Sequence, residues 1–289
     1  MPTTTSKRPS ARAQGRRLFD LTGRVAVITG GAGLLGVKHA EAIAEMGGLP
    51  VLCDVRGEEA ERAAARIAKR YAVRALGVRA DITDPRQVAT LRDRTLSSFG
   101  RVDILINNAA CNPAVTAAGR NGPAWSRLEQ FPLKAWNRDV AVGLTGAFLC
   151  SQAIGGAMAR RGRGVILNIA SDLSVIAPDQ RIYRQPKRAA AQQPVKPVSY
   201  SVVKTGLLGL SRYLATYWAA QGVRVNTLSP GGVAADQPEE FVQRLSQLIP
   251  LKRLAHPDEY KAAVVFLVSD ASSYMTGANL VMDGGRSCW

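Results

Sequence analysis

Short apolar runs, many of them rich in β-branched residues, alternate along the chain with longer segments whose apolar residues recur at helical spacing. The runs that predict strands are Arg24–Thr29, Leu49–Asp54, Val73–Ala80, Val102–Asn107, Val165–Ile169, Val223–Leu228 and Asn279–Met282. The segments that predict helices are Leu34–Met46, Glu58–Tyr71, a segment from Asp84-Pro85 to Ser98, a long one from Pro132 through Trp136 and Phe148, Ser199–Ala220 and Pro257–Ser269. Strands that are apolar on both faces, separated by such helices, predict a doubly wound Rossmann-type α/β domain. Its seven-stranded sheet is expected to be mostly or wholly parallel.

One domain over residues 21–289 accounts for this pattern, because the composition does not shift within it and no segment repeats. Residues 1–20 are rich in Ser, Thr and Arg, and we expect a basic, disordered extension there. Two stretches interrupt the alternation. The first is a loop over Cys111–Phe131, and the second is Asp172–Val198, which holds four prolines and five cations.

Charge and cysteine content narrow the class of protein. The formal net charge is +16, and the chain stays basic without the five cations that precede Asp20. Such a balance favours acidic partners, anionic substrates or a phosphate-bearing cofactor. Nucleic-acid binding is disfavoured, because the basic tail has no interleaved aromatic residues. The four cysteines show neither paired nor metal-ligand spacing, no metal site is expected, and no apolar run reaches the roughly 18 residues of a membrane span. We therefore expect a cytoplasmic protein.

A glycine-rich turn joins the first predicted strand to the first predicted helix, with the sequence Thr29-Gly30-Gly31-Ala32-Gly33-Leu34-Leu35-Gly36. Glycines allow the backbone to approach a phosphate closely, and the helix that follows offers free N–H groups. Asp54 closes the second strand, where a carboxylate accepts hydrogen bonds from the adenosine ribose of NAD and repels the 2′-phosphate of NADP. Arg56 follows and is the residue that could serve that phosphate instead. The sequence thus favours NAD over NADP.

Several further motifs, in this order, resemble the short-chain dehydrogenase/reductase family over nearly all of residues 21–289. They are Asp81-Ile82, Asn107-Asn108-Ala109-Ala110, Asn168-Ile169-Ala170-Ser171, Tyr200-Ser201-Val202-Val203-Lys204, Pro230-Gly231, and an ending that runs from Ser269-Asp270 to Asp283-Gly284-Gly285. The resemblance implies an oxidoreductase that moves a hydride between nicotinamide and a secondary alcohol or ketone. It also implies a homodimer or homotetramer built through the long helices.

The resemblance assigns roles to individual residues. Ser171, Tyr200 and Lys204 match the catalytic centre of the family, with Tyr200 as the proton-transfer group. The residues that match cofactor contacts are Gly30, Gly33, Leu35, Gly36, Asp54, Asp81, Ile82, Asn108, Tyr200, Lys204, Pro230, Gly231 and Val233. Elementary chemistry agrees, because Tyr200 and Lys204 are four apart and so share one helix face. Lowering a phenol pKa by three units takes about 4 kcal/mol of phenolate stabilisation, which a nearby ammonium can supply.

Tyr183 and Lys187 have the same spacing and lie nearer to Ser171, at the interval usual in the family. Pro186 between them would break the helix that must place them on one face. We therefore assign catalysis to Tyr200, and we interpret the longer interval as an insertion of roughly 16 residues within 172–198.

The chain departs from the family pattern at two places that matter. Leu34 stands where the phosphate turn usually has glycine, and Gly143 stands where many members have an asparagine of the proton relay. These departures leave open an alternative function, a catalytically silent dinucleotide-binding sensor.

The cations of the 172–198 segment suggest a polar or anionic, sugar-like substrate, because both ends of the segment are tethered beside the predicted reaction centre. Arg181 and Arg184 are the candidate substrate contacts, since arginine binds carboxylate and phosphate groups in a bidentate manner. A solvated surface loop or an oligomer contact remains the alternative for this segment.

Overall fold

A computed structural model of the chain describes residues 15, 17–112, 125–186 and 188–289. Its centre is one sheet of seven strands in the order β3-β2-β1-β4-β5-β6-β7, with every neighbouring pair parallel. The strands are β1 Val25–Thr29, β2 Leu49–Asp54, β3 Leu76–Arg79, β4 Ile104–Asn107, β5 Gly164–Ile169, β6 Val223–Pro230 and β7 Asn279–Met282. The predicted doubly wound, wholly parallel sheet is confirmed. The strand order reverses direction between β1 and β4, which is where such sheets bind ligands.

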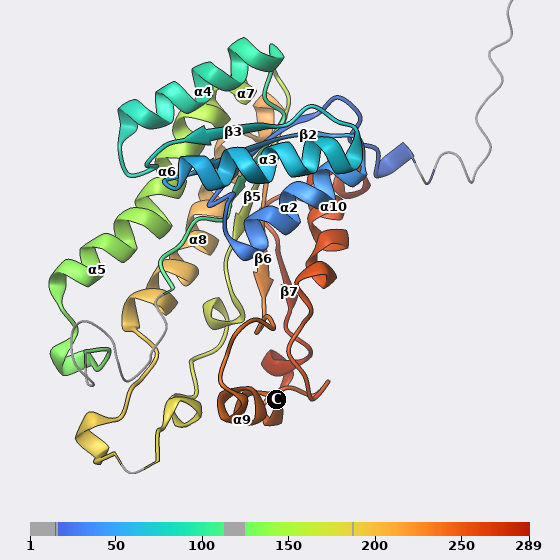
Figure 1. The fold of residues 1–289 in the computed structure, drawn as a ribbon. Helices are drawn as coiled ribbons and strands as arrows, with labels where there is room; N and C mark the ends of the chain where they lie inside the picture. The colour runs from blue at the N-terminus through green and yellow to red at the C-terminus, as the bar shows by residue number, and fades with distance from the viewer. Residues whose placement is uncertain (1–14, 16, 113–124, 187) are drawn as a thin grey trace, which may run out of the picture.

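Helices cover both faces of the sheet (Figure 1). The helices are α2 Leu34–Glu45, α3 Gly57–Tyr71, α4 Pro85–Phe99, α5 Leu133–Val140, α6 Gly146–Cys150, α7 Gly156–Arg160, α8 Val198–Tyr217, α9 Glu239–Gln247 and α10 Lys261–Val268. Successive residues of β1 alternate between two cores: Ala26 and Ile28 pack with α2, α3 and α10, whereas Val25 and Val27 pack with α4, α7 and α8. This alternation is why both faces of each strand had to be apolar.

Some helices and strands begin or end at other residues than the hydrophobic periodicity predicts. The predicted strand over 73–80 shortens to β3, and the predicted helix over 257–269 begins as a 3-10 turn before α10. The N-cap at Asp84 is confirmed, because its carboxylate accepts from the Arg86 N–H at 2.8 Å. Helix α9 was not predicted, although Pro238 precedes it and two glutamates occupy its first turn.

The long predicted helix is continuous from Leu133 to Arg160 but contains two π-helical turns, Ala141–Thr145 and Ser151–Gly155. By length and composition it could span a membrane, with a mean hydropathy of 1.5, which the count of apolar runs did not reveal. Its apolar residues Cys150, Ile154 and Met158 are fully buried in the core against the sheet. Only 39% of its most apolar 18-residue stretch is buried, so packing against the sheet accounts for part of this hydropathy.

The segment over 172–198 is folded and lies beyond the carboxyl ends of β5 and β6, beside α9 (Figure 1). Its 3-10 turn Gln180–Tyr183 places Ile182 in a small apolar core with Leu245 and Ile249, and the Tyr183 ring lies 5.5 Å from that of Phe241. The side chain of Gln193 holds the segment together, because it bonds to both backbone groups of Gln185 and to the carbonyl of Arg188. Position 187, part of the Tyr183–Lys187 alternative, lies outside the described residues, as does most of the predicted tail over 1–20.

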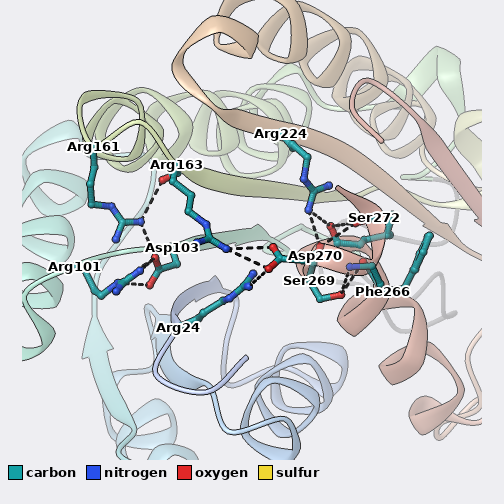
Figure 2. Close-up of polar contacts among 12 residues, drawn as sticks. Arg24, Arg101, Asp103, Arg161, Arg163, Arg224, Phe266, Ser269, Asp270 and Ser272 are labelled. Atoms are coloured by element: carbon teal, nitrogen blue, oxygen red, sulfur yellow. Dashed lines mark hydrogen bonds and ion pairs between the residues drawn. The ribbon is translucent and has the colours of Figure 1, made fainter. Parts of the chain in front are cut away.

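The opposite, amino ends of the strands carry an ion-pair network (Figure 2). The buried carboxylate of Asp103 accepts from Arg101 and Arg161, each at 2.6 Å, and from the Val25 N–H at 2.9 Å. Nearby, Asp270 pairs with Arg24 at 2.5 Å and with Arg163 at 3.2 Å. The network thereby fastens the chain just before β1, β4 and β5, and the sheet that positions the site below is fixed at this end.

Candidate active site

A cavity of about 1020 Å³ opens at the carboxyl ends of the strands. Of the predicted catalytic and cofactor residues, those that line it are Gly30, Gly33, Leu35, Asp54, Asp81, Ile82, Asn108, Ser171, Tyr200, Lys204, Pro230, Gly231 and Val233. Gly36 is not at the cavity wall and packs instead beneath the glycine-rich turn. Residues separated by 200 positions in the sequence therefore share one site, because parallel strands end at the same edge of the sheet.

The glycine-rich turn has no space for side chains at two positions. Gly30 has φ of +63°, and a Cβ there would lie 2.9 Å from the Cα of Ala109. A Cβ on Gly36 would come within 2.1 Å of the Gly30 carbonyl oxygen. The Asn108 amide donates to that same carbonyl at 3.2 Å and holds the turn in place. These close contacts leave a side-chain-free cradle at the start of α2, which fits the pyrophosphate of a dinucleotide.

Leu34, at the position where glycine is usual, opens α2 with its side chain half exposed at the cavity rim. The substitution therefore does not force the turn into another shape.

Asp54 ends β2 with a buried carboxylate that faces the cavity. One oxygen accepts from the Ala32 N–H at 3.1 Å, and the other accepts from Arg56 at its backbone N–H and at Nε. Arg56 also pairs with Glu59 at 2.7 Å. Two carboxylates thus neutralise the guanidinium, which leaves Asp54 as the acidic group at this wall.

Ser171, Tyr200 and Lys204 come together at the far side of the cavity from Asp54. Ser171 follows β5, and Tyr200 and Lys204 share one face of α8, as predicted from their spacing. The Lys204 Nζ lies 5.8 Å from the centroid of the Tyr200 ring and donates to the Ile169 carbonyl oxygen at 2.7 Å. A buried chain of polar side chains supports this placement: Asn107 donates to Asn168, and Asn168 donates to Ser211 of α8, each at 2.8 Å.

Burial shifts the acidity of both titratable groups. It lowers the pKa of Lys204 to about 8, together with the positive charge of Lys196. Burial raises the pKa of Tyr200 to about 12, opposed by Ser171 and assisted by the carboxylate of Asp172. The phenol is therefore a proton donor in this state, and it needs additional positive charge to act as a base near neutral pH.

Two charged residues that the motifs did not reveal complete the wall. Asp172 accepts from the Ser171 hydroxyl at 2.7 Å with one oxygen and from Arg286 at 2.7 Å with the other. Both side chains of the ion pair are buried, and both line the cavity. Asp172 begins the inserted segment and belongs to none of the motifs quoted above. Arg286 had no local signal, because its partner is 114 residues away.

The two arginines predicted to contact substrate have different positions. Arg184 lines the cavity, and its carbonyl oxygen accepts from Arg244 of α9. Arg181 lies outside the cavity, where its largely exposed side chain pairs with Asp179 at 2.7 Å. The prediction for Arg181 is thus corrected: a carboxylate two positions away holds its guanidinium at the surface. Lys196 is a second cation of the inserted segment that lines the cavity.

Gly143 lies in the first π-helical turn, at the position where an asparagine was expected. A Cβ on Gly143 would lie 2.4 Å from Cγ1 of Val203, so the valine methyl fills the space that a longer side chain would need. Tyr183 is the last residue of a 3-10 turn and is not part of an α-helix. This agrees with the assignment of the catalytic pair to Tyr200 and Lys204 of α8. Over the described ranges no group of three or more His, Cys, Asp or Glu side chains is placed to hold a metal ion.

Comparison with known proteins places these features in context. Residues 24–245 match the family model for short chain dehydrogenases. The D-threitol dehydrogenase of Mycolicibacterium smegmatis is 38% identical over 275 residues, which cover 92% of this chain and 94% of that protein. An NAD-dependent glycerol dehydrogenase of Listeria innocua is 31% identical and matches 92% of this chain and 95% of its own length. Among solved structures, a gluconate 5-dehydrogenase from Burkholderia cenocepacia in complex with NADP and tartrate superposes with a TM-score of 0.81 at 28% identity, and the match covers 95% of this chain and 99% of that one.

Proposed function

The chain belongs to the short-chain dehydrogenase family and is an oxidoreductase, and we propose that it transfers a hydride between NAD(H) and a secondary alcohol or ketone of a polar, sugar-like molecule. The observation that carries the proposal is the convergence of Ser171, Tyr200 and Lys204 at one wall of a cavity whose opposite wall holds the glycine turn and Asp54. When bound, the nicotinamide dinucleotide supplies the hydride acceptor and, in its oxidised form, a positive charge.

The residues of this chain have separate tasks in that reaction. Tyr200 accepts the hydroxyl proton of the alcohol, or returns it in the reverse direction, and Lys204 stabilises the phenolate by its charge. Ser171 contacts the reacting oxygen of the substrate. In this structure its hydroxyl donates to Asp172, and in the reaction it would turn to donate to the substrate oxygen, whose single proton goes to Tyr200. Arg286 holds Asp172 in place.

We propose NAD in preference to NADP because of the wall around Asp54. Its carboxylate is positioned to accept from the two ribose hydroxyls and would repel a 2′-phosphate. Arg56, the side chain that could bind such a phosphate, is already engaged by Asp54 and Glu59. Relatives of both cofactor classes exist, as the glycerol and gluconate dehydrogenases illustrate.

The proposed substrate is a polyol or sugar derivative with an anionic group. The cavity wall supports this, because Arg184, Lys196 and Arg286 line it and, among the residues that the structure describes, only Arg286 of these three is paired with a carboxylate. The names of two similar proteins point to substrates of this kind: a threitol dehydrogenase to a neutral polyol, and a gluconate 5-dehydrogenase to a sugar acid.

We also propose a cytoplasmic homodimer or homotetramer in which residues 21–289 form the catalytic domain. Phe148 of the long helix and Tyr213 and Tyr217 of α8 are large exposed side chains, which suits an interface through those helices. Burial raises the pKa of the Cys53 and Cys150 thiols, as expected for thiols that remain reduced in the cytoplasm.

The test is a panel of polyols, sugar acids and sugar phosphates, assayed with NAD and with NADP, on the wild type and on Tyr200→Phe. We expect substrate-dependent NADH formation by the wild type and a loss of roughly 10²–10⁴-fold in kcat for the variant. NADH binding, followed by fluorescence, should be unchanged within about threefold.

The alternative of a silent dinucleotide sensor, which the Gly143–Val203 contact favours, gives a different result in the same experiment. Such a protein would bind NADH tightly, yet no panel compound would be turned over by the wild type. Activity that survives in Tyr200→Phe would contradict the proposed mechanism directly.

A further inference from the structure

A second lysine lies against the ring of Tyr200. Lys196, at the end of the inserted segment, places its Nζ 3.7 Å from the centroid of the ring and donates to the Asn112 side-chain oxygen at 2.7 Å. The Lys204 ammonium lies 5.8 Å from the same centroid. Two ammonium groups therefore flank one phenol, and only that of Lys204 was predicted from the spacing of residues.

The position of Lys196 is built into the fold. Its backbone N–H donates to the Gln180 side chain at 2.8 Å, and the N–H of Val195 before it donates to the Ser126 hydroxyl at 3.1 Å. Pro197 follows and restricts the backbone where α8 begins. The inserted segment is thus anchored on both sides of the point where its lysine enters the cavity.

The charged groups near Lys196 do not draw its ammonium away from the Tyr200 ring. Asp172 and Arg286 act on it with opposite sign, and they are already paired with each other. Tyr183 and Lys204 are the other titratable neighbours of the cavity wall. Within the described part of the chain, Lys196 forms no ion pair with a carboxylate. Burial lowers its pKa to about 8, so it carries its charge at neutral pH and loses it in alkali.

An ammonium over an aromatic face is attracted to the negative face of the ring, and more strongly to the same ring once it is a phenolate. The attraction is therefore larger in the state in which Tyr200 has lost its proton. Burial makes that state costly here, and Gly143 provides no side-chain amide to assist the proton transfer.

We propose that Lys196 is a positioning residue of the reaction: its ammonium holds the Tyr200 ring and stabilises the phenolate, so the inserted segment contributes to proton transfer as well as to the substrate wall. The proposal rests on the proposed function, because it assigns Lys196 to the proton step of that reaction. It gives the insertion a chemical role that a solvated loop does not have.

The test compares Lys196→Met, which removes the charge, with Lys196→Arg, which retains it. The panel substrate with the highest rate is used with NAD, and kcat is measured from neutral to alkaline pH. We expect Lys196→Met to lower kcat about tenfold at neutral pH, the equivalent of about one pH unit in the ionisation of Tyr200. The deficit should shrink as the pH rises past about 8, since the wild type then loses the same charge.

Lys196→Arg should stay within about threefold of the wild type at neutral pH, and it should keep its charge above pH 8, where the wild type loses it, because a guanidinium does not deprotonate in this range. Lys69→Met, the same change at an exposed position of α3, is the matched control and should leave the profile unaltered. A readout independent of substrate is the ultraviolet absorbance of tyrosinate in the presence of NAD. The difference between each protein and its Tyr200→Phe counterpart isolates this phenol, whose ionisation should move to higher pH in Lys196→Met.

Three outcomes overturn the inference: a deficit in Lys196→Met that is the same at all pH values, a change confined to substrate KM, or an unshifted tyrosinate titration. Any of these, with Tyr200→Phe inactive, removes the role of Lys196 and leaves the proposed function intact. Activity in Tyr200→Phe would remove the proposed function itself.

Discussion

The two ends of the parallel sheet treat charge in opposite ways. At the amino ends, Asp103 and Asp270 are each shared between arginines, so the carboxylates of Figure 2 are paired although a smaller cavity lies beside them. At the carboxyl ends, Lys196, Lys204 and Tyr200 line open space and have pKa values displaced by burial. One end uses charge to fasten strands, and the other end keeps charge available for a ligand.

Replacing the same residue type at the two ends should separate these roles most clearly. Asp103→Asn should lower the free energy of unfolding by about 3 kcal/mol, because it leaves Arg101 and Arg161 without a carboxylate, while kcat per folded molecule stays constant. Asp172→Asn should lower stability too, but it should also lower kcat at least about tenfold, because the Ser171 hydroxyl loses its charged acceptor. Urea unfolding and steady-state kinetics on both variants measure the two effects. Equal loss of kcat in the two variants would show that the comparison is wrong.

A smaller effect concerns the buried histidine behind the glycine-rich turn. Burial lowers the pKa of His39 to about 4, and the side chain of Asn108 opposes this shift only in part. The unfolded chain protonates this residue near its ordinary pKa of 6.5, so stability falls as the pH drops from 6.5 toward 4. At pH 5 the wild type should have lost about 2 kcal/mol more than His39→Leu, relative to pH 7. If the free energy of unfolding changed by the same amount between pH 7 and pH 5 in both proteins, the lowered pKa of His39 would be contradicted.

The smallest expected effect is on cofactor preference. Asp54→Ala should raise the KM for NAD about tenfold, since hydrogen bonds to a carboxylate are lost, and should lower the KM for NADP as Arg56 is released. Ratios of kcat/KM for the two dinucleotides measure the change. Asp93→Ala, which removes an exposed carboxylate of α4 paired with Arg92, is the control and should leave the ratio unaltered. An unchanged ratio in Asp54→Ala would remove the argument for NAD.

Local chemistry explains how far the sequence alone could go. The strands and the Tyr200–Lys204 pair were predictable because their signals, alternation and a spacing of four, lie within a few residues. Asp54 and the glycine turn were predictable for the same reason. Arg286 was not, because the carboxylate that gives it meaning is brought near only by the order of β5, β6 and β7.

The inserted segment illustrates the other limit. Five cations suggested a substrate wall, but composition could not distinguish Arg181, which Asp179 holds at the surface, from Lys196, which enters the cavity. That distinction depends on hydrogen bonds that the backbone N–H groups of Lys196 and Val195 donate to the side chains of Gln180 and Ser126, and such contacts leave no pattern in the sequence. The small apolar contact with α9 was equally hidden, since that helix was not predicted.

The hydrogen bonds of Gln193 have a consequence for the kinetics of binding. Its amide bonds both backbone groups of Gln185, as a neighbouring strand would. The hydrogen bonds of this part of the wall are therefore already made without a ligand. A ligand that enters does not have to freeze a loose loop, and less conformational entropy is lost on association. Capture should therefore be limited by diffusion and desolvation of the incoming molecule rather than by a slow rearrangement of the protein.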